Sequence, residues 1–173
     1  ELKNITFTYH HDKESLIIED INFTVKAGER IALVGPTGAG KTTIINLLSR
    51  FYDPIKGSIL VDGYDIKELS TASLRKQLGI MTQDSFLFSG TIKENLTYGC
   101  ENVSDEAIVN ACKAIGCHSF ISKLQSGYDT LISSLTLSMG QKQLLALART
   151  LIKDPRILIL DEATSNIDTQ TEL

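Results

Sequence analysis

A glycine-rich octapeptide is the feature that most restricts how this chain can fold. Residues 35–42 read Gly-Pro-Thr-Gly-Ala-Gly-Lys-Thr and match the pattern G-x-x-x-x-G-K-[ST] in full. The apolar run Ile31–Val34 precedes the octapeptide and predicts a strand that is buried on both faces. Apolar residues at helical spacing follow it, namely Ile44, Ile45, Leu47, Leu48 and Phe51. The pattern therefore predicts an α/β fold in which a strand, a tight loop and a helix follow one another, with the helix ended by Asp53-Pro54.

The octapeptide has the residue types that hold phosphate groups. Glycines allow turns that aim backbone N–H groups at an anion, and the start of the next helix adds the positive end of its dipole. We expect the Lys41 ammonium to contact the β- and γ-phosphates of a nucleotide, and the Thr42 hydroxyl to bind Mg²⁺. The residues predicted to contact nucleotide here are Gly35, Thr37, Gly38, Ala39, Gly40, Lys41, Thr42 and Thr43. The alternative is a strand–helix turn that binds nothing.

An acidic pair follows a second apolar run. Ile157–Leu160 predicts another buried strand, and Asp161 and Glu162 come directly after it. Because ligands of open α/β sheets bind at the carboxyl ends of the strands, we expect Asp161 to hold Mg²⁺ through water. Glu162 is expected to orient or deprotonate an attacking water. By itself, such a pair also fits a helix cap or a loop.

The composition fits one folded domain. The chain has 173 residues, of which 42% are apolar and 22% charged, so disorder and fibrous repeats are excluded. The net charge of −4 argues against a nucleic-acid-binding surface. No apolar run approaches the ~18 residues that a membrane span needs. The cysteines Cys100, Cys112 and Cys117 lack the paired spacing of a zinc site and are expected to be free thiols.

The local patterns change near residue 83, from strand-like to helical. Strands are expected at Ile5–Tyr9, Ile21–Val25, Gly57–Val61 and Gly79–Thr82, and helices at Ala72–Leu78, Ser104–Gly116, His118–Leu124 and Ser138–Pro155. The Asp62-Gly63 pair predicts a hairpin turn, and Ser138 with Gln141 fits the capping box S-x-x-Q. This order predicts an α/β core formed by residues 1–82 and 155–173, with a helical subdomain, residues 84–153, inserted between them.

The segment Leu137–Gln141, Leu-Ser-Met-Gly-Gln, resembles the LSGGQ signature of ABC ATPases. The phosphate loop, this segment and the acidic pair occur in the order of that family, and the chain is identified as a member of it. The resemblance covers the whole chain and implies a P-loop NTPase core with an antiparallel β subdomain and an inserted α-helical subdomain. It also implies that the C-terminal part of the core, with the family's switch histidine, is truncated.

The resemblance assigns further residues to the site. Gln83 resembles the Q-loop glutamine, which acts in catalysis and contacts Mg²⁺, and Tyr9 lies where the family has an aromatic residue that stacks on adenine. The family forms head-to-tail dimers with two ATP molecules between identical or different domains. Ser138, Gly140 and Gln141 of one domain would contact the ATP that is bound to the other. By itself, Ser138 is more simply explained as the cap of its own helix.

Two segments resemble the exporters of the family, Asp161–Ser165 and Phe86–Leu96. In exporters, the region that corresponds to residues 83–96 helps to form a groove for a cytoplasmic helix of the transmembrane domain. The resemblance therefore implies ATP binding and hydrolysis that power export, at the cytoplasmic face of a membrane, in an integral transporter of the multidrug or lipid half-transporter type. Ser165–Asp168 resembles the family's D-loop.

The chain departs from the family pattern in two places near the signature. Met139 replaces its first glycine, and the preceding segment Tyr128–Thr136 is shorter than usual. With Ser138 and Gly140 present, we expect the phosphate contact to survive. One alternative is a DNA-repair or chromosome-type ABC ATPase, which usually carries heptads or cysteine quartets that are not seen here. The other is a nucleotide-binding fragment without turnover.

Overall fold

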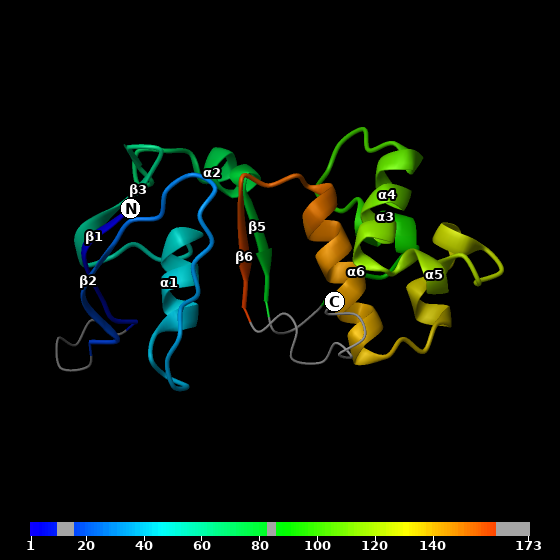
Figure 1. Ribbon diagram of the computed structural model, residues 1–173, viewed down its shortest axis with the longest axis horizontal. Helices are drawn as coiled ribbons and strands as arrows, with labels where there is room; N and C mark the ends of the chain where they lie inside the picture. The colour runs from blue at the N-terminus through cyan, green and yellow to red at the C-terminus, as the bar shows by residue number, and fades with distance from the viewer. Residues whose placement is uncertain (10–15, 83–85, 162–173) are drawn as a thin grey trace. The chain divides into compact units, whose positions relative to one another are not determined.

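The computed structural model describes residues 1–9, 16–82 and 86–161. They form two compact units, which we call unit 1 (residues 1–77) and unit 2 (from residue 78 onward) (Figure 1). In the part of the chain that the structure describes, no helix is both long and apolar enough to cross a membrane.

Unit 1 is built on a four-stranded antiparallel sheet with the strand order β2-β1-β3-β4. The strands are β1 (Leu2–Phe7), β2 (Ile18–Phe23), β3 (Lys56–Val61) and β4 (Tyr64–Asp65). Ile5 pairs with Ile21 across β1 and β2, and Leu2 pairs with Ile59 across β1 and β3. Leu2, Ile5 and Ile59 are buried, so apolar burial stabilises the sheet. β1 and β2 each begin three residues earlier and end two residues earlier than predicted.

β3 and β4 are joined by the predicted hairpin turn. Asp62 has φ 51° and Gly63 has φ 84°, so both residues adopt the left-handed conformation. Consecutive positive φ values are those of a type I′ turn, whose twist matches that of two paired strands. Asp-Gly is a favoured pair for this turn, which is why the sequence alone predicted it.

Helix α1 (Lys41–Leu48) follows the glycine-rich loop, and α2 (Thr71–Gln77) follows the hairpin. The apolar residues that α1 buries are Ile44, Ile45 and Leu47. The helix ends at its C-cap Ser49, and Arg50 has φ 50°. Phe51 lies beyond this end and is 58% exposed, so the predicted apolar stripe is shorter than expected.

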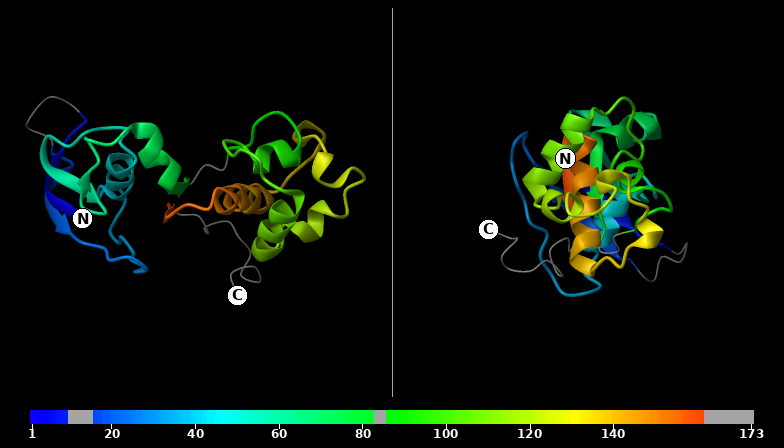
Figure 2. Two further views of the ribbon diagram at one scale, coloured as in Figure 1. Left: turned by 90° about the horizontal axis from the view of Figure 1, so that it is seen from above. Right: turned by 90° about the vertical axis from the view of Figure 1, so that its right-hand side faces the viewer.

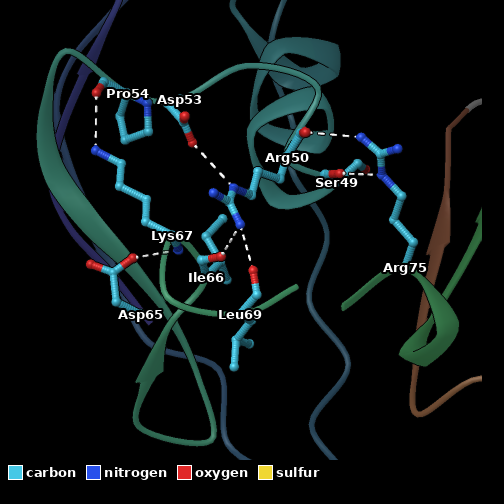
Figure 3. Close-up of polar contacts among 9 residues, drawn as sticks. All are labelled: Ser49, Arg50, Asp53, Pro54, Asp65, Ile66, Lys67, Leu69 and Arg75. Carbon is cyan, nitrogen blue, oxygen red and sulfur yellow. Dashed lines mark hydrogen bonds and ion pairs between the residues drawn. The ribbon is translucent and has the colours of Figure 1, made fainter. Parts of the chain in front are cut away.

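Two arginines hold the C-terminal end of α1 (Figure 3). Arg75 of α2 donates from Nε to the Ser49 carbonyl (3.0 Å) and from Nη2 to the Arg50 carbonyl (2.9 Å). Arg50 donates from Nη1 to the carbonyls of Ile66 (2.9 Å) and Leu69 (2.6 Å). Cations near the carbonyl end of a helix interact favourably with its dipole. These bonds fix the end of α1 to the segment after β4.

The apolar run Ile31–Val34 is not a strand, contrary to the prediction. Neither sheet of the described residues includes it, and Ile31 and Val34 are 53% and 88% exposed. A strand with apolar residues on both faces is buried only where neighbouring strands and covering helices surround it. The described residues of unit 1 do not supply these neighbours.

Unit 2 contains a two-stranded parallel sheet, in which β5 (Leu78–Met81) pairs with β6 (Ile157–Leu160). Both strands were predicted, but the burial of β6 was not predicted correctly, because three of its four side chains are between 37% and 50% exposed. Within the described residues, β6 has only β5 as a neighbour. Gly79 permits the close approach of the chain after α6, since a Cβ atom there would lie 2.5 Å from Cγ of Pro155.

In unit 2, α6 (Met139–Ile152) packs against both α3 (Ile92–Leu96) and α4 (Asp105–Ile115) (Figure 2). One apolar cluster of the unit consists of the buried residues Ile92, Leu96, Ile108, Cys112, Cys117, Ile121, Leu145 and Ala148. The remaining elements are α5 (His118–Ile121) and the 3-10 turns η1 (Gly127–Asp129) and η2 (Ile132–Ser134). α5 ends three residues before the predicted Leu124.

The ends of α4 are those predicted. The Ser104 side chain accepts a hydrogen bond from the Ala107 N–H and caps the first turn. Gly116 ends the helix with φ 84°, a conformation that costs glycine little. The sequence predicts both ends of α4 because each depends only on the residues next to that end.

Candidate nucleotide-binding site

The glycine-rich loop has the backbone conformation that its sequence predicted. Gly38 and Gly40 have φ 85° and 88°, and the Ala39 N–H donates to the Pro36 carbonyl at 3.1 Å to form a turn. A Cβ atom on Gly40 would lie 3.3 Å from Cγ1 of Ile18. A residue larger than glycine at position 40 would therefore have both an unfavourable φ and a close contact with Ile18, and it would displace the loop.

Gly40 is the N-cap of α1, and no side chain caps the N-terminus of this helix. The N–H groups of the first turn of an α-helix have no acceptor within the helix. Together with the helix dipole, they make this end a site for an anion. The loop residues from Gly35 to Gly40 and the first helical residues Lys41, Thr42 and Thr43 thus lie together in unit 1.

The Lys41 ammonium lies over the loop that precedes it. Its Nζ donates hydrogen bonds to the carbonyls of Gly35 (2.8 Å) and Pro36 (3.0 Å). The positive charge is therefore held at the loop, close to the helix N-terminus. Thr42, also in the first turn of α1, is exposed and carries a hydroxyl oxygen.

Tyr9 lies against α1, although it precedes the helix by more than thirty residues. Its hydroxyl donates to Oγ1 of Thr43 (3.3 Å) and accepts from Nδ2 of Asn46 (3.0 Å). The ring is in edge contact with Phe7 and Tyr52, with centroid distances of 4.9 Å in both cases, and Tyr9 is 39% exposed. Asn46 and Tyr52 were not predicted from the sequence, because no local spacing links either residue to Tyr9.

Ser138 begins α6 with the predicted capping box. Its Oγ accepts from the Gln141 N–H (3.1 Å), and its own N–H donates to Oε1 of Gln141 (3.0 Å). Met139, in the first turn, is 57% exposed. Ser138, Gly140 and Gln141 are thus gathered at one helix N-terminus of unit 2.

Asp161 directly follows β6, and its N–H donates to the Met81 carbonyl at 2.9 Å. Asp161 and Thr42 carry oxygen donors of the type that Mg²⁺ prefers, so their chemistry fits this metal. Gln83 and Glu162 lie outside the described residues, as does the segment Ser165–Asp168.

Comparison with known proteins identifies the family. The family model described as ABC transporter matches residues 18–165. The chain belongs to the ABC transporter family. It is 54% identical to the ABC transporter ATP-binding protein YfiC of Bacillus subtilis, over 100% of this chain and 29% of that protein. It is 46% identical to the ATP-dependent lipid A-core flippase of Syntrophus aciditrophicus, again over 100% of this chain and 29% of that protein.

A solved structure has the same fold. The structure of a bacterial Atm1-family ABC exporter with ATP bound superposes with a TM-score of 0.92 and 48% identity, over 99% of this chain and 30% of that chain. This similarity confirms the predicted α/β fold class with its antiparallel β subdomain. The chain is an ABC transporter ATP-binding domain similar to those of exporter-type half-transporters, and it spans less than a third of the length of the relatives named here.

In this ABC domain, an aromatic surface follows the predicted Q-loop position in unit 2. Phe86 and Tyr98 are 67% and 59% exposed, and Phe88 stacks on Tyr98 with a centroid distance of 4.1 Å. Asn95 is buried, and its Oδ1 accepts from the Phe88 N–H at 2.8 Å. The conformation of the segment from Phe86 to Tyr98 is therefore stabilised by contacts between its own residues.

Arg149 connects this segment to α6, the helix that begins after Ser138. Its Nε donates to the Asn95 carbonyl (2.7 Å), its Nη2 to Oδ1 of Asn95 (3.1 Å), and its Nη1 to the Phe86 carbonyl (3.0 Å). The guanidinium also lies over the Phe88 ring, 5.3 Å from its centroid. Burial lowers the pKa of Arg149, but a guanidinium remains charged at neutral pH. The role of Arg149 was not predicted from the sequence, since its partners lie more than fifty residues away along the chain.

Proposed function

We propose that this domain binds ATP with Mg²⁺ and hydrolyses it to power export by a membrane transporter. The observation that carries the proposal is the geometry of the phosphate loop. Two glycines in the left-handed conformation lead into a helix N-terminus without a side-chain cap, and the Lys41 ammonium lies over the same loop. Such a site suits a compact polyanion.

The residues of the chain have distinct roles in this proposal. The loop amides and Lys41 hold the triphosphate, and Glu162 orients or deprotonates the attacking water, assisted by Gln83. Thr42, Asp161 and Gln83 would hold Mg²⁺, which neutralises charge on the phosphate oxygens when it is bound. Catalysis in this class of reaction depends mainly on positioning and on electrostatic stabilisation.

We further propose a head-to-tail dimer, with an identical or a different ABC domain as partner. Ser138, Gly140 and Gln141 of one domain would then contact the ATP held by the other. In support of this role, the first turn of α6 is exposed at Ser138 and Met139. The proposed division of each domain remains a core of residues 1–82 and 155–173 with a helical subdomain of residues 84–153.

The transmembrane partner is proposed to bind at residues 83–96. The exposed aromatic side chain of Phe86 and the neighbouring Tyr98 support a protein interface there, since aromatic residues are enriched at such surfaces. Arg149 would hold this surface against α6, the helix to which it belongs. The domain would then work at the cytoplasmic face of a membrane.

Glu162→Gln in the full-length protein tests the proposed hydrolysis. The amide cannot accept a proton from water, so we expect ATP binding and ATP-dependent dimerisation to persist while phosphate release slows about 100-fold or more. Phosphate release and size-exclusion chromatography with light scattering provide the measurements. Glu68→Gln, an exposed acid in unit 1, is the matched control. Normal turnover in the Glu162 variant would assign the base to another residue.

A further inference from the structure

The hydroxyl of Tyr9 is bound by two side chains of one helix face. It donates to Oγ1 of Thr43 (3.3 Å) and accepts from Nδ2 of Asn46 (3.0 Å). Thr43 and Asn46 are three residues apart in α1, so their side chains neighbour each other on the helix surface. The hydroxyl therefore has both a donor and an acceptor role fulfilled by the helix that starts at the phosphate loop.

The ring of Tyr9 is also restrained at its edges. Phe7 and Tyr52 both contact it in nearly perpendicular orientation, with interplanar angles of 87° and 84°. Phe7 and Tyr52 contact each other as well, with centroids 5.8 Å apart. Perpendicular contacts of this kind are the favoured geometry of aromatic pairs. Three rings from two segments of unit 1, the end of β1 and the chain after α1, thus restrain one another.

These contacts join Tyr9 to the helix that follows the phosphate loop, although Tyr9 and the loop are far apart in the sequence. Lys41, at the first residue of α1, faces the phosphate loop, and Asn46, five residues later, holds Tyr9. One short helix therefore sets the position of both the ammonium and the aromatic ring. A rigid spacing between them matters for a ligand that has a triphosphate at one end and a planar base at the other.

We propose that Asn46 and Tyr52 are positioning residues that hold the Tyr9 ring for the base of the nucleotide and so determine how strongly this site distinguishes ATP from a bare triphosphate. The inference rests on the proposed function, in which Tyr9 stacks on adenine. Asn46 acts through the hydroxyl of Tyr9, and Tyr52 acts through the edge of its ring. Neither residue contributes to the binding of the phosphates.

The test compares the Kd of Mg-ATP with that of Mg-tripolyphosphate in the full-length protein. Tyr9→Ala is expected to weaken ATP binding about 10-fold, since base stacking is lost, and to leave tripolyphosphate binding unchanged. Asn46→Ala and Tyr52→Ala are expected to lose part of the same selectivity, about 3-fold each. Tyr52→Phe keeps the ring edge and should restore wild-type selectivity. Tyr64→Ala, an exposed tyrosine on β4, is the control.

A double-mutant cycle separates positioning from general destabilisation. Tyr9→Phe removes the hydroxyl to which Asn46 binds, so the effects of Tyr9→Phe and Asn46→Ala on selectivity should not add. Thermal unfolding of each variant shows that it is folded. The inference is overturned if Asn46→Ala and Tyr52→Ala bind both ligands as the wild type does, or lose affinity for both equally. If Tyr9→Ala itself retains the selectivity, the role of Tyr9 in the proposed function is wrong, and the inference fails with it.

Discussion

The helices α1 and α6 both begin at predicted ligand sites, but their N-termini are built differently. α1 starts after Gly40, which has φ 88° and offers no side chain as a cap. α6 starts after Ser138, which has an extended backbone and forms a capping box with Gln141. No side chain caps the first end, whereas at the second end the N–H of Gln141 is paired with Ser138.

This difference bears on the partners that we propose for the two sites. We propose that α1 and its loop hold the phosphates of the nucleotide, because the loop amides and the Lys41 ammonium belong to one unit. At α6, the Ser138 oxygen accepts from Gln141, but a hydroxyl can donate its own proton at the same time. Capping the helix and contacting a phosphate are therefore compatible roles for Ser138.

The largest effect is expected at the α1 end. Lys41→Ala removes the ammonium from the loop, and we expect the Kd of Mg-ATP to rise about 100-fold, because hydrogen bonds from a charged donor to phosphate are among the strongest in proteins. Equilibrium binding measures the effect. Lys56→Ala, an exposed lysine on β3, controls for the loss of one charge. An unchanged Kd in the Lys41 variant would contradict the proposed phosphate site.

At the α6 end, a pair of substitutions separates capping from ligand binding. Ser138→Ala loses the cap and should lower the free energy of unfolding by about 1 kcal/mol. It should also weaken ATP-dependent dimerisation. Ser138→Asp keeps a cap but places a carboxylate near the incoming phosphate, so we expect near-normal stability with dimerisation reduced about 10-fold. Chemical denaturation and light scattering measure the two properties. If Ser138→Asp dimerises like the wild type, Ser138 only caps its helix.

The smallest effect is expected at Met139. Its side chain is 57% exposed, and it takes no part in the capping box. Met139→Gly should change ATP-dependent dimerisation less than about 3-fold and lower the free energy of unfolding by at most about 1 kcal/mol, the helix propensity difference. A change in dimerisation larger than 10-fold would show that residue 139 itself takes part in the dimer contact.

The elements that the sequence predicted well depend on residues close together in the chain. The Asp62-Gly63 turn, the Ser104 cap and the Ser138 box are each contained within four residues. The phosphate loop belongs to the same class, since glycines, lysine and helix start are adjacent. The burial of Ile31–Val34 was not predicted correctly, because burial depends on strands and helices that neighbour the run in space.

The sequence by itself determined the phosphate loop and the helix caps, because each is a pattern of adjacent residues with a local physical cause. It also indicated the family, through the order in which such local motifs occur along the chain. Only the tertiary structure decided that Tyr9 is held by Asn46 and that Arg149 holds Phe86, since these pairs are 37 and 63 residues apart. A side-chain hydrogen bond between residues so far apart along the chain produces no periodic pattern in the sequence. It forms only when packing has brought the two segments together.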